Sequence, residues 1–223
     1  MSEFIERYYN SPVKSENITN KKHFSIKKVW KSAFDVVVSE HFTGRLRNPQ
    51  RSSGQSAKML TRIATMVALN VTGRAAFFMF SDFKPVYAIT IISGITLGSL
   101  GGFLTGALTM LVSNFLFGQG PWTPWQMLAL GLIGFISGAL AENGLIPRKR
   151  VWISLYGFIM AIVVYGGIMN PAAMFMSVAR PTWRLLLAYY ISGIPVDLVK
   201  GTASFLFLWI GTKSVLGKIE RAW

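Results

Sequence analysis

The sequence predicts an all-α integral membrane protein, a six-helix bundle with a basic extension at its amino terminus. Of its 223 residues, 52% are hydrophobic and only 14% are charged, whereas about 25% charged residues is usual for soluble domains. The charges are also segregated. Ten Lys/Arg and five Asp/Glu precede Ala57, and the later residues form apolar runs with basic residues at their ends. We therefore expect a basic cytoplasmic or interfacial segment over 1–57 and a membrane domain over 58–223.

The amino-terminal segment contains a helical pattern near residues 26–42. Its apolar positions Ile26, Val29, Trp30, Phe34 and Val37 recur at helical spacing, and lysines occupy the other faces. This pattern is typical of an amphipathic helix in the headgroup plane, although it also fits a helix docked on a partner or a small soluble hairpin. Because no early apolar run is long enough for a secretory signal, the amino terminus is expected in the cytoplasm.

Six apolar segments follow, since a span needs about 20 apolar residues and fewer where neighbours shelter the helix. They are 59–80, 85–98, 101–117, 124–141, 151–169 and a sixth that begins between 189 and 195 and ends near 212. As one helix, the 33 residues of 85–117 would be about 50 Å long, against a hydrocarbon thickness of about 30 Å. A hairpin turn at 98–102 resolves the excess.

The distribution of basic residues predicts the orientation. With the amino terminus inside, six crossings place 18 Lys/Arg inside and only Arg74, Lys84, Arg180 and Arg184 outside. This asymmetry agrees with the positive-inside rule. Both termini are then cytoplasmic in a multi-pass protein of the cell membrane, and the stretch FGQGPWTPWQM at 117–127 lies at the outer mouth.

That stretch is predicted to hold a ligand. Prolines flank Trp122-Thr123 and restrict the loop, which lowers the entropy lost when it closes on a ligand. Indole rings beside the amides of Gln119 and Gln126 suit a large ligand with apolar faces and a polar rim. The alternative is that both tryptophans are ordinary interfacial anchors.

Polar residues inside the spans are further candidates. An unpaired charge at the bilayer centre costs roughly 2.5 to 3.5 kcal/mol, so Asp197 and Lys200 either pair with each other at i, i+3 or contact a ligand. Arg74 either reaches the surface, pairs with Asp82 or binds the ligand. The full set of candidate ligand-binding residues is Arg74, Lys84, Asn114, Phe117, Gln119, Trp122, Thr123, Trp125, Gln126, Asn170, Asp197 and Lys200.

Catalytic patterns are absent from the sequence. It has no cysteine, phosphate-binding loop, His-Glu-x-x-His or Gly-x-Ser-x-Gly. Both histidines precede the spans, and the carboxylates Asp82, Glu142 and Asp197 are far apart along the chain. We therefore expect neither an enzyme nor a metal site, and a partner must supply energy for uphill transport. A lipid-modifying enzyme and a passive channel are the alternatives from other classes.

The net charge of +14 is explained by membrane orientation, so no nucleic-acid partner is expected.

Small residues recur at a spacing of four. Gly94, Gly98, Gly102 and Gly106 form one row and Gly134 with Gly138 another. Such rows let helix backbones approach closely and are common in membrane helices, so ordinary packing explains them.

Several motifs together resemble a known family. They are Gly73-Arg74, Phe83-Lys84-Pro85, Ile92-Ser93-Gly94-Ile95-Thr96-Leu97-Gly98, Ser113-Asn114-Phe115, FGQGPWTPWQM and Gly193-Ile194-Pro195-Val196-Asp197. Over residues 59–212 the chain resembles an energy-coupling factor (ECF) transporter S component, in particular the cobalamin-type S components of Gram-positive bacteria.

The resemblance implies a six-helix bundle with an outward pocket for a corrinoid, cobalamin or cobinamide, although another vitamin or precursor stays open. It also implies a membrane scaffold (T) subunit and two cytoplasmic ATPase subunits, so ATP acts only through partners and no cofactor is bound catalytically. The S component topples in the membrane to deliver its ligand. Ala64-x-x-x-Ala68 resembles the family's scaffold-docking motif. The basic segment before residue 57 departs from compact S components.

Overall fold

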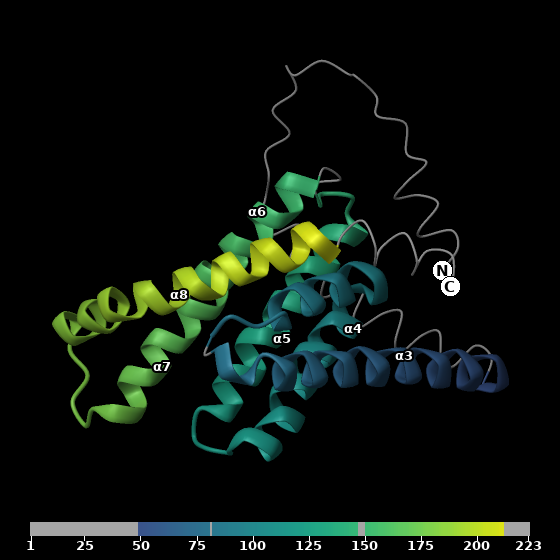
Figure 1. Ribbon diagram of the computed structural model, residues 1–223. Helices are drawn as coiled ribbons and strands as arrows, with labels where there is room; N and C mark the ends of the chain where they lie inside the picture. Colours follow the sequence, from purple (N-terminus) through teal and green to yellow (C-terminus); the bar gives the residue numbers. More distant parts are fainter. Residues whose placement is uncertain (1–48, 81, 147–149, 212–223) are drawn as a thin grey trace.

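The computed structural model describes residues 49–80, 82–146 and 150–211, and these residues are all-helical (Figure 1). The elements are α3 (Pro49–Ala76), the 3-10 turn η1 (Phe78–Phe80), α4 (Val86–Phe117), α5 (Thr123–Glu142), α6 (Arg150–Met160), the π-helical turn η2 (Ala161–Gly166), α7 (Gly167–Ser177) and α8 (Trp183–Gly211). The amphipathic helix predicted at 26–42 lies outside the described residues. Helix α3 begins before the predicted domain boundary at residue 58.

Four stretches of the described chain are long and apolar enough to cross a membrane. They are Val86–Phe117, Thr123–Glu142, Arg150–Ser177 and Trp183–Gly211. Large apolar side chains stand exposed along α8, including Leu187, Ile191, Ile194, Val196, Leu198, Val199 and Ile210. Because water disfavours such a continuous apolar surface, this exposure fits a helix that faces lipid.

Helix α4 is folded back on itself at Gly98. This glycine has φ +80° and ψ 177°, a conformation that costs little only without a Cβ. A Cβ added to Gly102 would lie 2.6 Å from the Cα of Gly94, yet eight residues along a straight helix span about 12 Å. The two arms therefore run side by side, and the hairpin predicted from segment length is confirmed.

Helix α5 packs closely against both arms of α4. A Cβ on Gly134 would lie 2.1 Å from the carbonyl oxygen of Gly102, and one on Gly94 would lie 2.3 Å from the carbonyl oxygen of Gly134. These backbones are thus in direct contact, which only glycine permits. The glycine rows in the sequence are the contact surface of the α4–α5 core.

Glu142, at the end of α5, caps the hairpin turn. Its Oε1 accepts a hydrogen bond from the Ser99 backbone N–H at 2.8 Å, and the Ser99 hydroxyl donates to the same carboxylate at 3.2 and 3.3 Å. The carboxylate satisfies an N–H that the reversed backbone leaves without a helical acceptor. Glu142, which lies far from the other membrane-domain carboxylates along the chain, is therefore a structural cap of the turn.

The last two apolar stretches lie side by side, with α6, η2 and α7 running along α8 (Figure 1). Helix α8 begins at Trp183, so the predicted start of the sixth segment between 189 and 195 is wrong. Pro195 lies inside α8 and is exposed. Its missing N–H opens one hydrogen bond without ending the helix, because the apolar pattern continues on both sides.

Candidate functional site

Two polar clusters contain most of the candidate residues. The first, which we name the loop network, consists of Arg74, Ser113, Asn114, Gln119, Thr123 and Gln126, and joins the end of α3 to the α4–α5 loop. The second, the Asp197 triad, consists of Asn170, Asp197 and Lys200 on α7 and α8. Each cluster brings residues from different helices into one hydrogen-bonded group.

Arg74 anchors the loop network to α4. Its Nη1 donates to Asn114 Oδ1 at 2.9 Å, to the Ser113 hydroxyl and to the Met110 sulfur at 3.3 Å. The sequence left a pair with Asp82 open for Arg74, but the hydrogen bonds described for Arg74 are with residues of α4. Ser113 and Asn114 lie almost fully buried, so the guanidinium is held against the interior.

Asn114 extends the network to α5. Its Nδ2 donates to Thr123 Oγ1 at 2.9 Å and to Gln126 Oε1 at 2.8 Å. Thr123 in turn donates to Gln119 Oε1 at 2.8 Å. With its Oδ1 accepting from Arg74, Asn114 uses both ends of its amide, which fixes the orientation of that amide. Five predicted site residues are therefore one connected unit.

The local sequence explains why the loop is so placed. Thr123 opens α5, and Pro124 follows within the first turn, where its fixed φ suits a helix and its missing N–H leaves no unsatisfied donor. The Gln126 N–H donates to the Trp122 carbonyl at 2.9 Å, completing the first turn. Pro124 therefore helps to set where α5 begins, one residue before the predicted start of the fourth segment at 124.

Both tryptophans of the stretch stand at the surface of this network. Trp122 is 41% exposed and Trp125 is 39% exposed. The Trp122 ring covers Gly120, where an added Cβ would lie 2.3 Å from the ring. Nearby, Phe117 stacks on Phe78 with centroids 5.1 Å apart. These rings form an aromatic border beside the polar network.

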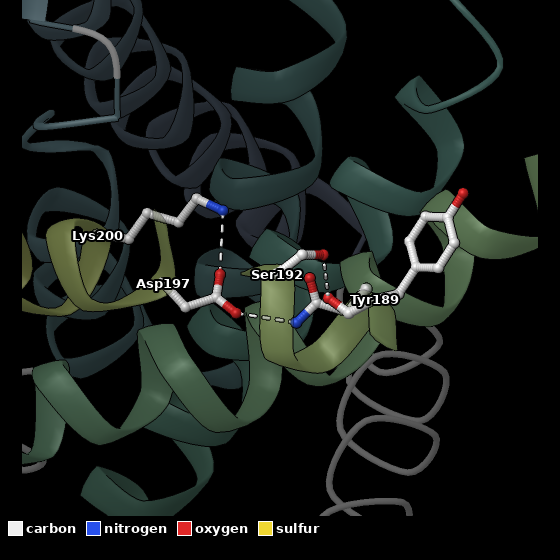
Figure 2. A network of polar contacts seen from close by, with 5 residues as sticks. Tyr189, Ser192, Asp197 and Lys200 are labelled. Carbon is white, nitrogen blue, oxygen red and sulfur yellow. Dashed lines mark hydrogen bonds and ion pairs between the residues drawn. The ribbon is translucent and has the colours of Figure 1, made fainter. Parts of the chain in front are cut away.

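The Asp197 triad is buried within helices that are otherwise apolar. Figure 2 shows Lys200 and Asp197 on one face of α8, where Lys200 Nζ lies 3.1 Å from Asp197 Oδ1. Asn170 Nδ2 donates to the other carboxylate oxygen at 2.9 Å. With Asp197 5% exposed and Lys200 9% exposed, both carboxylate oxygens are satisfied internally. Of the two alternatives left open by the sequence, the structure therefore contains the i, i+3 ion pair.

The π-helical turn η2 brings α7 against this triad. A Cβ on Gly166 would lie 2.5 Å from Asp197 Oδ2, so the glycine permits the close approach. Lys200 Nζ also lies 5.3 Å from the centre of the Tyr165 ring, within cation–π range, and Tyr87 meets that ring edge-on at 5.1 Å. The extra residue of a π turn often occurs at functional sites.

Lys84 lies in the loop between η1 and α4. Partial burial lowers the pKa of Lys84, the positive charge of Arg74 lowers it further, the carboxylate of Asp82 raises it, and Lys200 contributes a smaller lowering. The pKa of Lys84 is therefore affected by Arg74 of the loop network and by Lys200 of the Asp197 triad.

Sequence reasoning missed several members of this site. Ser113, Met110, Tyr87 and Tyr165 lie in or beside the two clusters, although only Ser113 belonged to a motif that was singled out. Asn70, one turn before Arg74, is fully buried and donates to Thr90 Oγ1 at 2.9 Å. Its position four residues before Arg74, on the same face of the helix, was a signal that could have identified it. Among the described residues, no three His, Asp or Glu side chains are grouped to hold a metal.

The two residues predicted to dock on a scaffold lie on α3, outside both clusters. Ala64 and Ala68 are exposed, as are Thr61, Thr65 and Thr72 along the same helix. The described part of the chain leaves this small-residue face uncovered.

Comparisons with known proteins identify relatives. A family model described as "ECF-type riboflavin transporter, S component" matches residues 54–209. A UPF0397 protein of Aliivibrio salmonicida is 27% identical over 121 residues, which are 50% of this chain and 64% of the relative. The chain thus spans less than two thirds of that relative's length. No solved structure matches the chain. The corrinoid expected from the resemblance gains no support from the description of the matched family, which names riboflavin.

Proposed function

The chain belongs to the family of ECF-type transporter S components, and from this premise we propose that it binds a vitamin at the end of the bundle that carries the loop network. The protein would hand that ligand to a scaffold subunit driven by two ATPase subunits. It would have no catalytic site of its own. The four long apolar helices make it a membrane protein, consistent with this role.

One observation carries the proposal. Arg74, Asn114, Thr123, Gln119 and Gln126 form one hydrogen-bonded network beside the aromatic residues of the α4–α5 loop. A few fixed polar groups beside flat apolar rings are what a planar, polar-rimmed vitamin requires. The connected network holds these groups in place before the ligand arrives, which lowers the entropy cost of binding.

Riboflavin is the first candidate ligand, because the description of the matched family names it and its ring system is flat and polar at one edge. A corrinoid is the second candidate, because FGQGPWTPWQM resembles the loop of cobalamin-type S components. Isothermal titration calorimetry of the purified protein with riboflavin, cobalamin, cobinamide and a vitamin outside both classes separates these ligands. The absence of binding to every vitamin would contradict the proposal.

Six crossings are part of the same proposal. The two arms of α4, divided at Gly98, would count separately, and α3 would cross at the side of the bundle with its small-residue face toward the scaffold. The amino and carboxyl termini would then both be cytoplasmic, as the basic residues predict. Cysteine labelling from either side of intact cells tests this topology.

Transport is expected to depend on the partners. Uptake of the labelled vitamin should occur with the scaffold and both ATPase subunits present, and should fall to background when the scaffold subunit is omitted. The measurement is uptake into proteoliposomes loaded with ATP, with a variant ATPase that cannot hydrolyse ATP as the control. Uptake by this chain alone would show a channel or a self-sufficient carrier instead.

Binding and docking are expected to separate by mutation. Trp122→Ala or Trp125→Ala should weaken vitamin binding by roughly tenfold, the effect of losing about 1.4 kcal/mol of ring contact, while assembly with the scaffold persists. Ala64→Leu or Ala68→Leu should do the reverse, because bulk on that face blocks close helix approach. Calorimetry and co-purification with the scaffold measure the two effects. Unchanged affinity in both tryptophan variants would remove the loop from the binding site.

A further inference from the structure

Arg74 is a partly buried cation whose described contacts are all with uncharged groups. Its Nη1 donates to a hydroxyl, an amide oxygen and a thioether sulfur, those of Ser113, Asn114 and Met110. Its guanidinium carbon also lies 5.6 Å from the centre of the Phe117 ring. Each of these contacts solvates a positive charge without neutralising it. A cation taken partly out of water normally acquires an anion.

The donors of Arg74 are also only partly used. A guanidinium carries five N–H groups in a planar fork, and the hydrogen bonds described for Arg74 all come from Nη1. The Nε and Nη2 donors have no hydrogen bond among the described residues. The described bonds therefore orient the guanidinium through Nη1, and within the described residues the edge that carries Nε and Nη2 is available to another acceptor.

The surrounding charges leave this part of the molecule positive. Three cations, Arg74, Lys84 and Lys200, and the carboxylate of Asp82 act on one another in this region, and Asp197 is the carboxylate paired with Lys200. Asp197 already accepts from Lys200 and from Asn170, so both of its oxygens are occupied. Three positive charges against two negative charges leave one positive charge, in a region where burial and repulsion already lower the pKa of Lys84.

We propose that the ligand carries an anionic oxygen group, a phosphate or a carboxylate, that binds to the Nε and Nη2 donors of the Arg74 guanidinium. This inference rests on the proposed vitamin-binding function and narrows its substrate class. The planar fork of arginine matches phosphate and carboxylate oxygens in a two-point contact, and such charge-assisted bonds are stronger than neutral ones. Phe117, stacked on Phe78 beside Arg74, supplies an apolar face for the remainder of the ligand.

A purely structural role for Arg74 is the alternative, in which its bonds to α4 only tie α3 to the bundle. Under that alternative the protein has no preference for anionic ligands, and loss of Arg74 weakens the binding of charged and neutral ligands alike. The two roles therefore differ in ligand selectivity, which stability measurements alone do not distinguish.

Two matched pairs of ligands test the proposal on the wild-type protein. The first pair is riboflavin and flavin mononucleotide, and the second is cobinamide and cobinamide phosphate. The two members of each pair differ by one phosphate group. The phosphorylated member of the pair that binds is expected to bind about tenfold tighter or more, as measured by calorimetry. Equal affinity for both members of a pair, or tighter binding of the member without phosphate, would overturn the proposal that the ligand carries an anionic group. The vitamin-binding function would then still stand. Failure of these four ligands and of every other vitamin in the calorimetric series to bind would overturn both.

Variants assign the preference to Arg74. In Arg74→Gln the preference for the phosphorylated member should fall to near unity, whereas Arg74→Lys should keep part of it because the charge remains. Arg180→Gln, at an exposed position between α7 and α8, serves as the matched control and should keep the full preference. A preference that survives in Arg74→Gln would overturn the assignment. If Arg74→Gln does not purify as a folded protein, the wild-type pairs and Arg74→Lys still decide.

Discussion

Gly134→Ala is expected to destabilise the protein strongly, because it places a methyl group inside the contact between α4 and α5. The new Cβ would lie 2.1 Å from the carbonyl oxygen of Gly102, and this neighbour is backbone that cannot rotate away. We expect a loss of unfolding free energy at or above about 3 kcal/mol, the upper end of overpacking costs. Thermal unfolding and the fraction of monodisperse protein in detergent measure it.

Gly167→Ala is the matched control for that change. Gly167 also lies in a helix, but nothing lies within 4 Å of an added Cβ. Alanine should be neutral or slightly stabilising there, because it favours the helix over glycine by up to about 1 kcal/mol. Equal thermal stability of the two variants would show that α4 and α5 do not meet backbone to backbone.

Loss of either partner of the buried ion pair is expected to have the second large effect. Asp197→Ala leaves Lys200 buried without its carboxylate, and Lys200→Ala leaves Asp197 with Asn170 alone. Breaking a buried pair in this way costs about 3 to 5 kcal/mol. Each single variant should therefore show a lowered unfolding temperature and reduced yield from the membrane.

The double variant Asp197→Leu with Lys200→Met distinguishes a pair from two independent charges. Because no buried charge is left unpaired, its loss of stability should be much smaller than the sum of the two single losses. A simple sum would contradict the pair. Measuring vitamin affinity on the double variant also separates roles: retained affinity would make the pair structural, and lost affinity would place it at the ligand.

Several features of the fold could be predicted because they depend on neighbours in sequence. Segment length alone required the reversal near Gly98. The i, i+3 spacing of Asp197 and Lys200 placed both on one helical face, and the prolines around Trp122 fixed where α5 begins. The sixth segment was predicted to begin too late, between 189 and 195, and the later of these limits falls on Pro195 inside α8. An exposed proline in an apolar helix only opens one hydrogen bond and leaves the helix intact.

The candidate site was predictable only in part. The residue types of the α4–α5 loop and the intramembrane charges identified most members of both clusters. They did not identify the partners of Arg74, because a nearby carboxylate such as Asp82 is the partner expected for a cation, and only the packing of the helices places Ser113 and Asn114 against Arg74. Tyr165 and Tyr87 escaped detection because aromatic residues in apolar helices are common, and nothing in their spacing distinguishes a ring beside Lys200 from one in the core.

The sequence by itself determined that this is a helical membrane protein, where most of its helices begin and turn, and which polar residues require an explanation. Composition and periodicity report the environment of each residue, and the hydrophobic effect acts on that pattern directly. Only the tertiary structure decided that Arg74 joins Asn114, that Asn170 reaches Asp197 across 27 positions, and that Glu142 caps the turn at Ser99. These contacts join residues far apart in the chain, so they depend on how the helices pack. That packing is set by the shapes of the helix surfaces and by which glycines face each other, and a local sequence pattern does not specify either.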